Sequence, residues 1–76
     1  MKTKLKPIAL NDYLTLNYPI TLYPESEGGY TVMIADLPGC LSQGDTLDEA
    51  VANIQEAKAA WLETAWDCGD EIPLPK

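Results

Sequence analysis

Apolar and polar positions alternate along two stretches in the first half of the chain. Residues 18–23 (YPITLY) place Ile20 and Leu22 on one face of a strand, and residues 30–36 (YTVMIAD) alternate in the same way. In this second stretch Tyr30, Val32 and Ile34 share one face, and Thr31, Met33 and Ala35 share the other. A period of two residues is typical of β-strands. The intervening turn, PESEGG (24–29), is rich in Gly and Pro, so the pattern predicts an antiparallel hairpin.

A period of three to four residues replaces this alternation in the second half of the chain. The apolar positions are Leu47, Ala50, Val51, Ile54, Ala57, Trp61 and Ala65. This spacing predicts one long amphipathic helix. Thr46 and Glu49 fit a capping box at its start, and Gly69 is a typical residue for its end. Lys58 falls inside the apolar stripe, where we expect its stem to cover the core and its ammonium group to reach water.

Shorter segments connect these elements. Pro38 and Gly39 predict a turn, and residues 40–44 (CLSQG) are long enough for a third strand. Gly44 is interpreted as a point where the chain bends before the helix. Residues 71–75 (EIPLP) predict an extended tail, with a fourth strand as the alternative.

The pattern in the first seventeen residues does not select one type of secondary structure. Residues 1–8 contain Lys2, Lys4 and Lys6 and are interpreted as a basic arm. Residues 9–17 (ALNDYLTLN) are consistent with a helical turn capped near Asn11 or Asp12, or with an extended lead-in to the first strand.

The order of elements is therefore β-β-β-α, with residues 71–75 as a candidate for a fourth strand. This order predicts an α+β fold in which one helix covers one face of a small antiparallel sheet. With 76 residues the chain is expected to form a single domain over 1–76. The opposite face of the sheet holds Thr21, Tyr23, Met33 and Ala35, and is half covered at best. This favours self-association into a homo-oligomer or a bound partner.

The charge is unevenly distributed. The chain has five lysines, no arginine and twelve carboxylates. After the first six residues, two lysines remain against all twelve carboxylates, a net charge of −10. Such a surface repels phosphate backbones, so direct binding of nucleic acid is not expected. It suits a basic partner, although acidic charge that only keeps a small protein soluble is the alternative.

No set of residues in the chain predicts catalysis. The absence of histidine excludes Ser-His and Cys-His nucleophiles within the chain. Asp45, Asp48 and Glu49 cluster, but capping of the helix explains them. No spacing matches a metal site or a phosphate-binding loop, so neither a metal nor another cofactor is expected.

The cysteines and tryptophans are interpreted as structural residues. Cys40 and Cys68 are expected to be reduced and in or near the core, with one disulfide or a surface thiol as alternatives. Trp61 is expected to pack on the sheet, whereas Trp66 lies at the edge of the stripe and fits either the core or a contact surface. No segment resembles a signal peptide or a membrane span, which predicts a cytoplasmic protein.

An ordered set of motifs resembles the HicB family of antitoxins. The run GGYTVMIADLPGCLSQGDTLDEAVANIQEA (28–57) carries GGY, then D-L-P-G-C-x-S-x-G-x-T-x-x-E-A, then N-x-x-E-A. The matching residues are Gly28, Gly29, Tyr30, Asp36, Leu37, Pro38, Gly39, Cys40, Ser42, Gly44, Thr46, Glu49, Ala50, Asn53, Glu56 and Ala57. The lead YLTLNYPI and the tail GDEIPLP extend the resemblance to about residues 13–75. From Gly28 to Ala50 these motif residues, with the exception of Tyr30, are interpreted as mainly structural.

The resemblance implies a function through a partner. It implies a partial RNase H-like fold without the nuclease site, in a type II toxin–antitoxin pair. The partner would be a HicA-like toxin, a small basic protein that cleaves mRNA with a histidine, and the antitoxin would cover its active site. Many HicB-like proteins also carry a C-terminal DNA-binding domain. None is expected here, so operator binding and autoregulation are not predicted.

The residues expected at the partner surface are Glu25, Glu27, Tyr30, Asp36 and Asp45. Their charges and hydroxyl group suit a basic partner, and they lie in loops or at strand ends. A solitary homo-oligomer that binds another protein is the competing hypothesis. An RNase H-like nuclease is the enzymatic one, and it requires clustered carboxylates that hold two metal ions.

Overall fold

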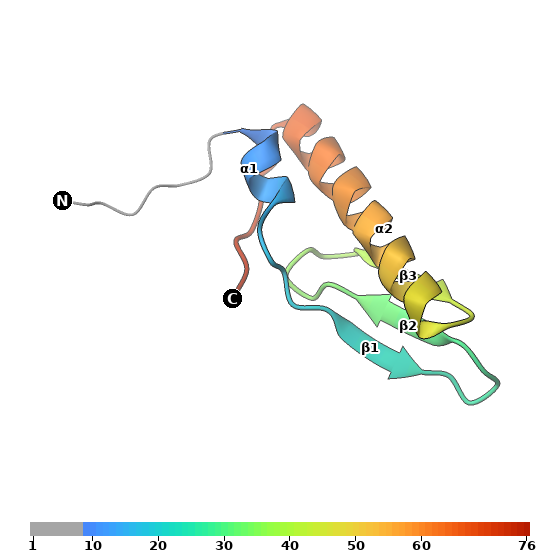
Figure 1. Ribbon diagram of the computed structural model, residues 1–76. Helices are drawn as coiled ribbons and strands as arrows, with labels where there is room; N and C mark the ends of the chain where they lie inside the picture. Colours follow the sequence, from blue (N-terminus) through green and yellow to red (C-terminus); the bar gives the residue numbers. More distant parts are fainter. Residues whose placement is uncertain (1–8) are drawn as a thin grey trace.

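The computed structural model describes residues 9–76 and confirms the α+β fold class. The elements are α1 (Leu10–Leu14), β1 (Thr21–Pro24), β2 (Tyr30–Met33), β3 (Leu41–Gly44) and α2 (Leu47–Cys68). The strands form one antiparallel sheet in the order β1-β2-β3, and α2 lies across one face of it (Figure 1). The basic arm predicted for residues 1–8 lies outside the described residues.

The register of the sheet confirms the predicted faces of β2. Val32 pairs with Leu22 of β1 and Ser42 of β3, and it is fully buried in the core that includes Ile54 of α2. Met33, one residue further on, lies on the opposite face and is partly exposed. The alternation read from the sequence therefore assigns the buried and open faces correctly.

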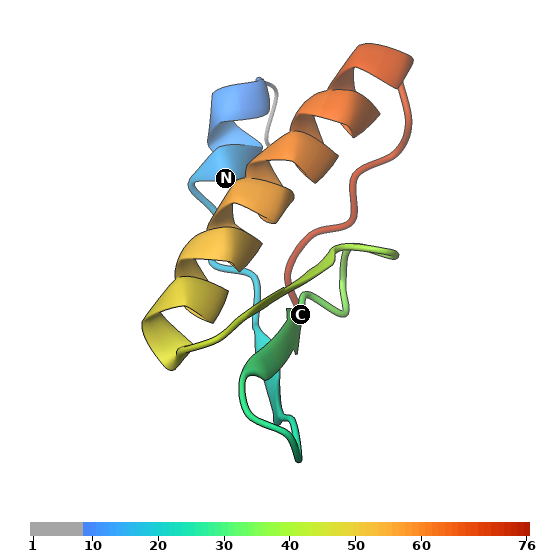
Figure 2. The ribbon, with the colours of Figure 1, turned by 90° about the vertical axis from the view of Figure 1, so that its right-hand side faces the viewer.

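The buried face of α2 differs from the predicted stripe. Ala50, Ile54, Leu62 and Ala65 are buried. The prediction missed Leu62, whereas Leu47 and Val51 remain 49% and 39% exposed. Figure 2 shows α1 beside the later turns of α2 and the C-terminal segment on the other side. Leu62 belongs to the later half of α2, whereas Leu47 and Val51 belong to its first turns.

For residues 9–17 the sequence left a helical turn or an extended segment open, and the structure has the helix α1. Its N-cap is not at Asn11 or Asp12. Ala9 is the N-cap residue, and its backbone N–H donates to the Asp12 carboxylate at 3.1 Å. Asp12 thus supplies half of a capping box that an alanine, which lacks a side-chain acceptor, cannot complete.

The turn at Pro38 and Gly39 joins β2 to β3 as predicted. The Ile34 N–H donates to the Cys40 carbonyl at 3.0 Å, and the Cys40 N–H donates to the Leu37 carbonyl at 2.9 Å. Gly39 has a φ of 81°, a conformation that residues with a Cβ rarely adopt. Leu37 and Cys40 are both buried, so this turn is part of the core.

Gly44 is required for close packing, and the bend expected there falls on the next two residues, Asp45 and Thr46. The φ of Gly44 is not positive, but a Cβ at this position would lie 2.4 Å from the Ala50 backbone N. The start of α2 therefore packs directly on the end of β3.

The predicted cap of α2 is present. Thr46 Oγ1 accepts from the Glu49 N–H at 3.1 Å. In return, Glu49 Oε1 accepts from the N–H of Asp45, the residue before Thr46.

The C-terminal segment forms no strand, so the fourth-strand alternative is wrong. Pro73 and Pro75 lack the backbone N–H that a ladder needs. The segment is instead held by buried Ile72 and by the Tyr18 hydroxyl, which donates to the Pro73 carbonyl at 2.6 Å. Burial, together with nearby Tyr13 and Asp36, raises the pKa of Tyr18 above 10.0.

Lys58 also departs from the expected arrangement. Its ammonium group donates to the Leu16 carbonyl at 2.8 Å and lies 5.5 Å from the centre of the Tyr18 ring. It therefore binds the segment between α1 and β1 to α2 instead of only reaching water.

Both cysteines are free. Cys40 is in the core as predicted, but Cys68 is exposed, so the core interpretation was wrong for Cys68.

Candidate partner-binding surface

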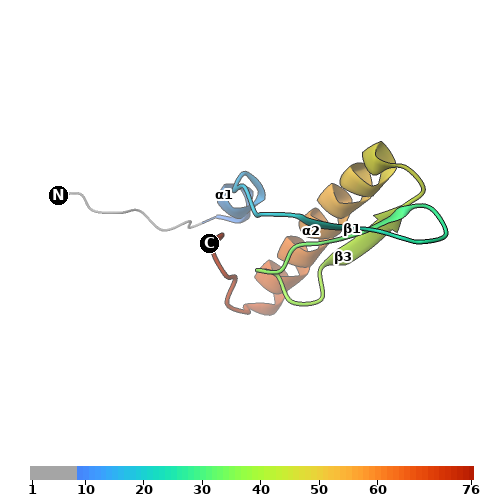
Figure 3. The same cartoon turned by 90° about the horizontal axis from the view of Figure 1, so that it is seen from below.

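The end of the molecule that contains the β1–β2 loop and the start of α2 carries a polar pocket of about 550 Å³. Figure 3 shows the loop and the first turns of α2 at the same end, away from α1. We call this hollow the acidic pocket. Its carboxylates are Glu25, Asp45 and Glu49, and no lysine or arginine is among its described lining residues. Three like charges without a lining cation favour a positively charged ligand.

Local structure positions each carboxylate. Glu25 directly follows β1, and its Oε2 accepts from the Thr31 hydroxyl at 2.6 Å. Asp45 lies between β3 and α2, where its N–H is bound by Glu49. Glu49 is in the first turn of α2, so the helix dipole favours its charge. Glu25 and Glu49 each use one carboxylate oxygen in these contacts, and all three acidic residues remain exposed.

The structure brings together three of the five residues predicted for the partner surface. Glu25, Tyr30 and Asp45 line the acidic pocket. Glu27 is exposed on the same β1–β2 loop but does not line the pocket. Asp36 lies at the other end of β2, where its Oδ2 accepts from the Lys76 N–H at 3.2 Å.

Sequence reasoning did not assign Gln43, Glu49 or Asn53 to this surface, although all three line the pocket. Asn53 donates from Nδ2 to the Gln43 carbonyl at 2.7 Å. The available signal was helical spacing: Asp45, Glu49 and Asn53 are four residues apart, which places the two helical members on one side of α2.

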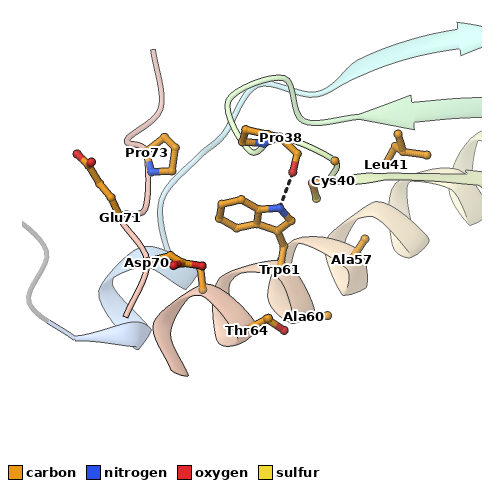
Figure 4. A pocket seen from close by; sticks show the side chains of 12 residues that line it. Pro38, Cys40, Leu41, Ala57, Ala60, Trp61, Thr64, Asp70, Glu71 and Pro73 are labelled. Atoms are coloured by element: carbon orange, nitrogen blue, oxygen red, sulfur yellow. Dashed lines mark hydrogen bonds between the residues drawn. The ribbon is translucent and has the colours of Figure 1, made fainter. Parts of the chain in front are cut away.

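A second, apolar hollow of about 640 Å³ lies towards the later turns of α2. We call it the Trp61 cleft. Its walls include Trp61, Ala57 and Ala60 of α2 and Leu41 of β3, and Figure 4 shows the indole directed towards the Pro38 turn. Trp61 Nε1 donates to the Pro38 carbonyl at 2.7 Å, which fixes the ring while part of it stays exposed. The predicted packing role of Trp61 is therefore confirmed.

Cys40 also lines this cleft, but its thiol is not poised for chemistry. Burial raises the pKa of Cys40, and the positive charge of Lys58 opposes that shift only in part. A thiol with a raised pKa is neutral and weakly nucleophilic at neutral pH.

Trp66 is 41% exposed, and its ring centre lies 6.3 Å from that of Tyr13. Trp66 therefore lies at the edge of the core.

The acidic residues do not form a metal centre. Within residues 9–76, no group of three or more Cys, Asp or Glu side chains is arranged to hold a metal ion. Over the same residues, neither helix is long and apolar enough to cross a membrane.

Comparison with known proteins assigns the family. The family model described as the HicB-like antitoxin of bacterial toxin–antitoxin systems matches residues 18–76. The chain belongs to this family, which confirms the resemblance seen in its motifs. The match includes the sheet, the turn at Pro38, α2 and the C-terminal segment, and begins after α1.

Individual relatives differ in length. The UPF0150 protein ssl0259 of Synechocystis is 45% identical over 58 residues, covering 76% of this chain and 80% of the relative. Antitoxin HicB of Escherichia coli K12 is 38% identical over 60 residues, covering 79% of this chain but 44% of the relative. Antitoxin HicB 1 of Photorhabdus laumondii is 42% identical over 60 residues, covering 79% of this chain but 39% of the relative. The chain therefore spans less than half of these named antitoxins.

Proposed function

We propose that this chain is an antitoxin that binds a small, basic HicA-like toxin and inhibits it by covering its mRNA-cleaving active site. Family membership supports the class of partner. The observation that carries the proposal for this chain is the acidic pocket, where three carboxylates face solvent without a lining lysine or arginine. In this proposal the chain is not an enzyme: the toxin supplies the catalytic histidine, which this chain lacks entirely.

The proposed surface centres on Glu25, Tyr30 and Asp45, with Glu27 beside them. Exposed carboxylates attract a basic partner over several ångströms and accelerate its approach. Tyr30 is half-buried and offers a ring with a hydroxyl group, a combination common in protein interfaces. Asp36 is a separate, weaker candidate because it lies with the C-terminal segment.

Retention on a column tests the partner. The tagged full chain is exposed to native lysate at low salt, and the co-purifying proteins are identified by mass spectrometry. Recovery of one small basic protein whose RNA cleavage is then stopped by this chain is the expected result. A recovered protein whose cleavage continues at excess antitoxin contradicts the proposal.

Charge reversal tests the surface. The triple variant Glu25→Lys, Glu27→Lys and Asp45→Lys is compared with Glu56→Lys, Glu63→Lys and Asp67→Lys, which changes the net charge equally on exposed positions of α2. We expect the first triple to weaken toxin binding by about a hundredfold, since three desolvated or partly desolvated ion pairs are lost, and the control by under about fivefold. Equal losses would show that only net charge matters. Asp36→Lys alone then measures the separate contribution of Asp36.

A homo-oligomer is the second proposal, and it is compatible with the first. The face of the sheet opposite α2 leaves Tyr23 48% and Leu41 58% exposed. Apolar side chains on an open sheet face favour pairing with another copy or a partner. Sedimentation at rising concentration tests whether the chain forms a homo-oligomer, and a constant monomer mass would contradict this proposal.

A partial RNase H-like architecture and a cytoplasmic location remain predictions.

A further inference from the structure

The Trp61 cleft combines apolar walls with an acidic rim. Trp61, Ala57 and Ala60 form the α2 side of the cleft, and Leu41 lines its edge at the start of β3, where the register places Leu41 on the sheet face opposite α2. Asp70 and Glu71 lie on the rim, both exposed, and the cleft has no lysine or arginine among its described lining residues. Figure 4 shows these two carboxylates at the side where the C-terminal segment leaves α2. The volume of about 640 Å³ is in the range of sites that bind a ligand group.

The cleft and the acidic pocket are separate hollows that lie along the same strand, β3. Leu41 at the start of β3 lines the cleft, whereas Gln43 and Gly44 at its end line the acidic pocket. Two to three residues of extended chain span about 7–10 Å. A single small protein that lies along β3 can therefore contact both hollows at once.

We propose that the Trp61 cleft binds a large apolar side chain of the toxin, presented beside a lysine or arginine that pairs with Asp70 and Glu71. This inference rests on the proposed antitoxin function and names a second contact for it. An apolar side chain in a pocket with a polar rim is the usual arrangement of an interface hot spot. The net negative charge of the rim selects a basic segment over an acidic or neutral one.

The two hollows then have different kinetic roles. Exposed charges mainly change the association rate, because they act before contact. Desolvated apolar contacts form last and mainly set the dissociation rate. The acidic pocket accordingly governs how fast the toxin arrives, and the Trp61 cleft governs how long it stays.

Substitution of one exposed alanine separates the cleft from the rest of the surface. Ala60 lines the cleft, whereas Ala52 is exposed on α2 nine residues before Trp61, which is half a turn away from it around the helix. Glu and Arg are both good helix formers, so Ala60→Glu, Ala60→Arg, Ala52→Glu and Ala52→Arg are all expected to fold. Circular dichroism and urea unfolding verify this for each variant.

The binding partner in this test is the co-purified basic protein with its catalytic histidine replaced by alanine, immobilised for kinetic measurement. Both Ala60 variants are expected to raise the dissociation rate at least about tenfold, since either side chain fills the cleft, with Ala52 variants within about twofold. Asp70→Asn combined with Glu71→Gln is expected to raise it by about threefold and to reduce its dependence on salt.

The outcomes distinguish the inference from the proposed function. If the unmodified chain binds and the Ala60 and Ala52 variants dissociate alike, the cleft assignment is wrong while the antitoxin function stands. If the unmodified chain does not bind at all, both fail. If Ala60→Arg weakens binding but Ala60→Glu does not, charge rather than cavity filling is responsible, and the apolar contact is refuted. If sedimentation shows a dimer that Ala60→Glu dissociates, a second copy occupies the cleft instead.

Discussion

The two ends of strand β2 are built on different physical principles. At the Tyr30 end, the backbones of β3 and α2 meet at Gly44, and the surrounding carboxylates face solvent. At the Ile34 end, Leu37 and Cys40 are buried, and the Trp61 indole is hydrogen-bonded across to the turn. At the first end, close backbone packing at Gly44 and hydrogen bonds to Glu25 and Glu49 hold the chain, and the carboxylate residues stay exposed. The second end uses its side chains for the core, and the Trp61 cleft lies beside them.

The largest effect is expected from a single methyl group at the acidic end. In Gly44→Ala the Cβ meets the backbone of Ala50, which cannot move aside as a flexible side chain would. We expect a loss of at least about 4 kcal/mol in the free energy of unfolding, enough to leave so small a domain largely unfolded.

Gly28→Ala is the matched control for that clash. Gly28 has a φ of 101° but nothing within 4 Å of an added Cβ, so only backbone strain is introduced. The expected loss is about 1–2 kcal/mol in urea unfolding. Equal losses at Gly28 and Gly44 would show that close packing of β3 on α2 is not what fixes this end.

Leu62→Ala tests the packing of the apolar end. Leu62 is fully buried, and its truncation is expected to cost about 3 kcal/mol of unfolding free energy. Val51→Ala, at a position 39% exposed, is expected to cost under about 1 kcal/mol. If Val51→Ala cost more than Leu62→Ala, the stripe predicted from the sequence, which contains Val51 but not Leu62, would be the one that faces the core.

Tyr18→Phe removes the hydrogen bond that holds the C-terminal segment. The Pro73 carbonyl loses its partner, with an expected cost of about 1.5 kcal/mol below pH 9. The raised pKa of Tyr18 means that its contribution is fully present below the pKa of the unfolded chain and is lost as pH rises through the folded value. Unfolding free energy of the unmodified chain should therefore fall above about pH 10, and Tyr18→Phe should flatten this fall. A fall of equal steepness in both chains contradicts the assignment.

The smallest effect is expected at the cap of α2. Thr46→Ala removes the acceptor for the Glu49 N–H and is expected to cost about 1 kcal/mol. Asp48→Asn, in the same turn, removes only a charge near the helix dipole and is expected to cost about 0.5 kcal/mol. A larger loss for Asp48→Asn would indicate that charge, not the hydroxyl cap, starts the helix.

The sequence predicted those features that depend on local periodicity and capping. The faces of β2, the length of α2 and the Thr46 cap follow from spacing over a few residues. Leu62 was missed because it lies beside the predicted stripe, and the buried side of α2 depends on packing against segments far away along the chain, α1 among them. The cap of α1 at Ala9 was missed because the side chain that completes it belongs to Asp12.

The candidate surface shows the same division. Glu25, Tyr30 and Asp45 were predicted from charge and loop position, and the fold brings them into one pocket. Asp36 was grouped with them by the same argument, but it sits at the opposite end of β2 beside Lys76. The extended chain of β2 separates Asp36 from Tyr30, so charge and loop position alone grouped residues that the strand itself holds apart.

The central claim is that the acidic end binds a basic toxin and blocks its cleavage of mRNA. The most direct measurement is the cleavage of a labelled mRNA by a fixed amount of the co-purified basic protein, titrated with this chain. We expect cleavage to stop near a fixed stoichiometric ratio, and we expect the variant with Glu25, Glu27 and Asp45 reversed to need about a hundredfold more chain. Unchanged cleavage at large excess, or equal inhibition by the triple reversal, would contradict it.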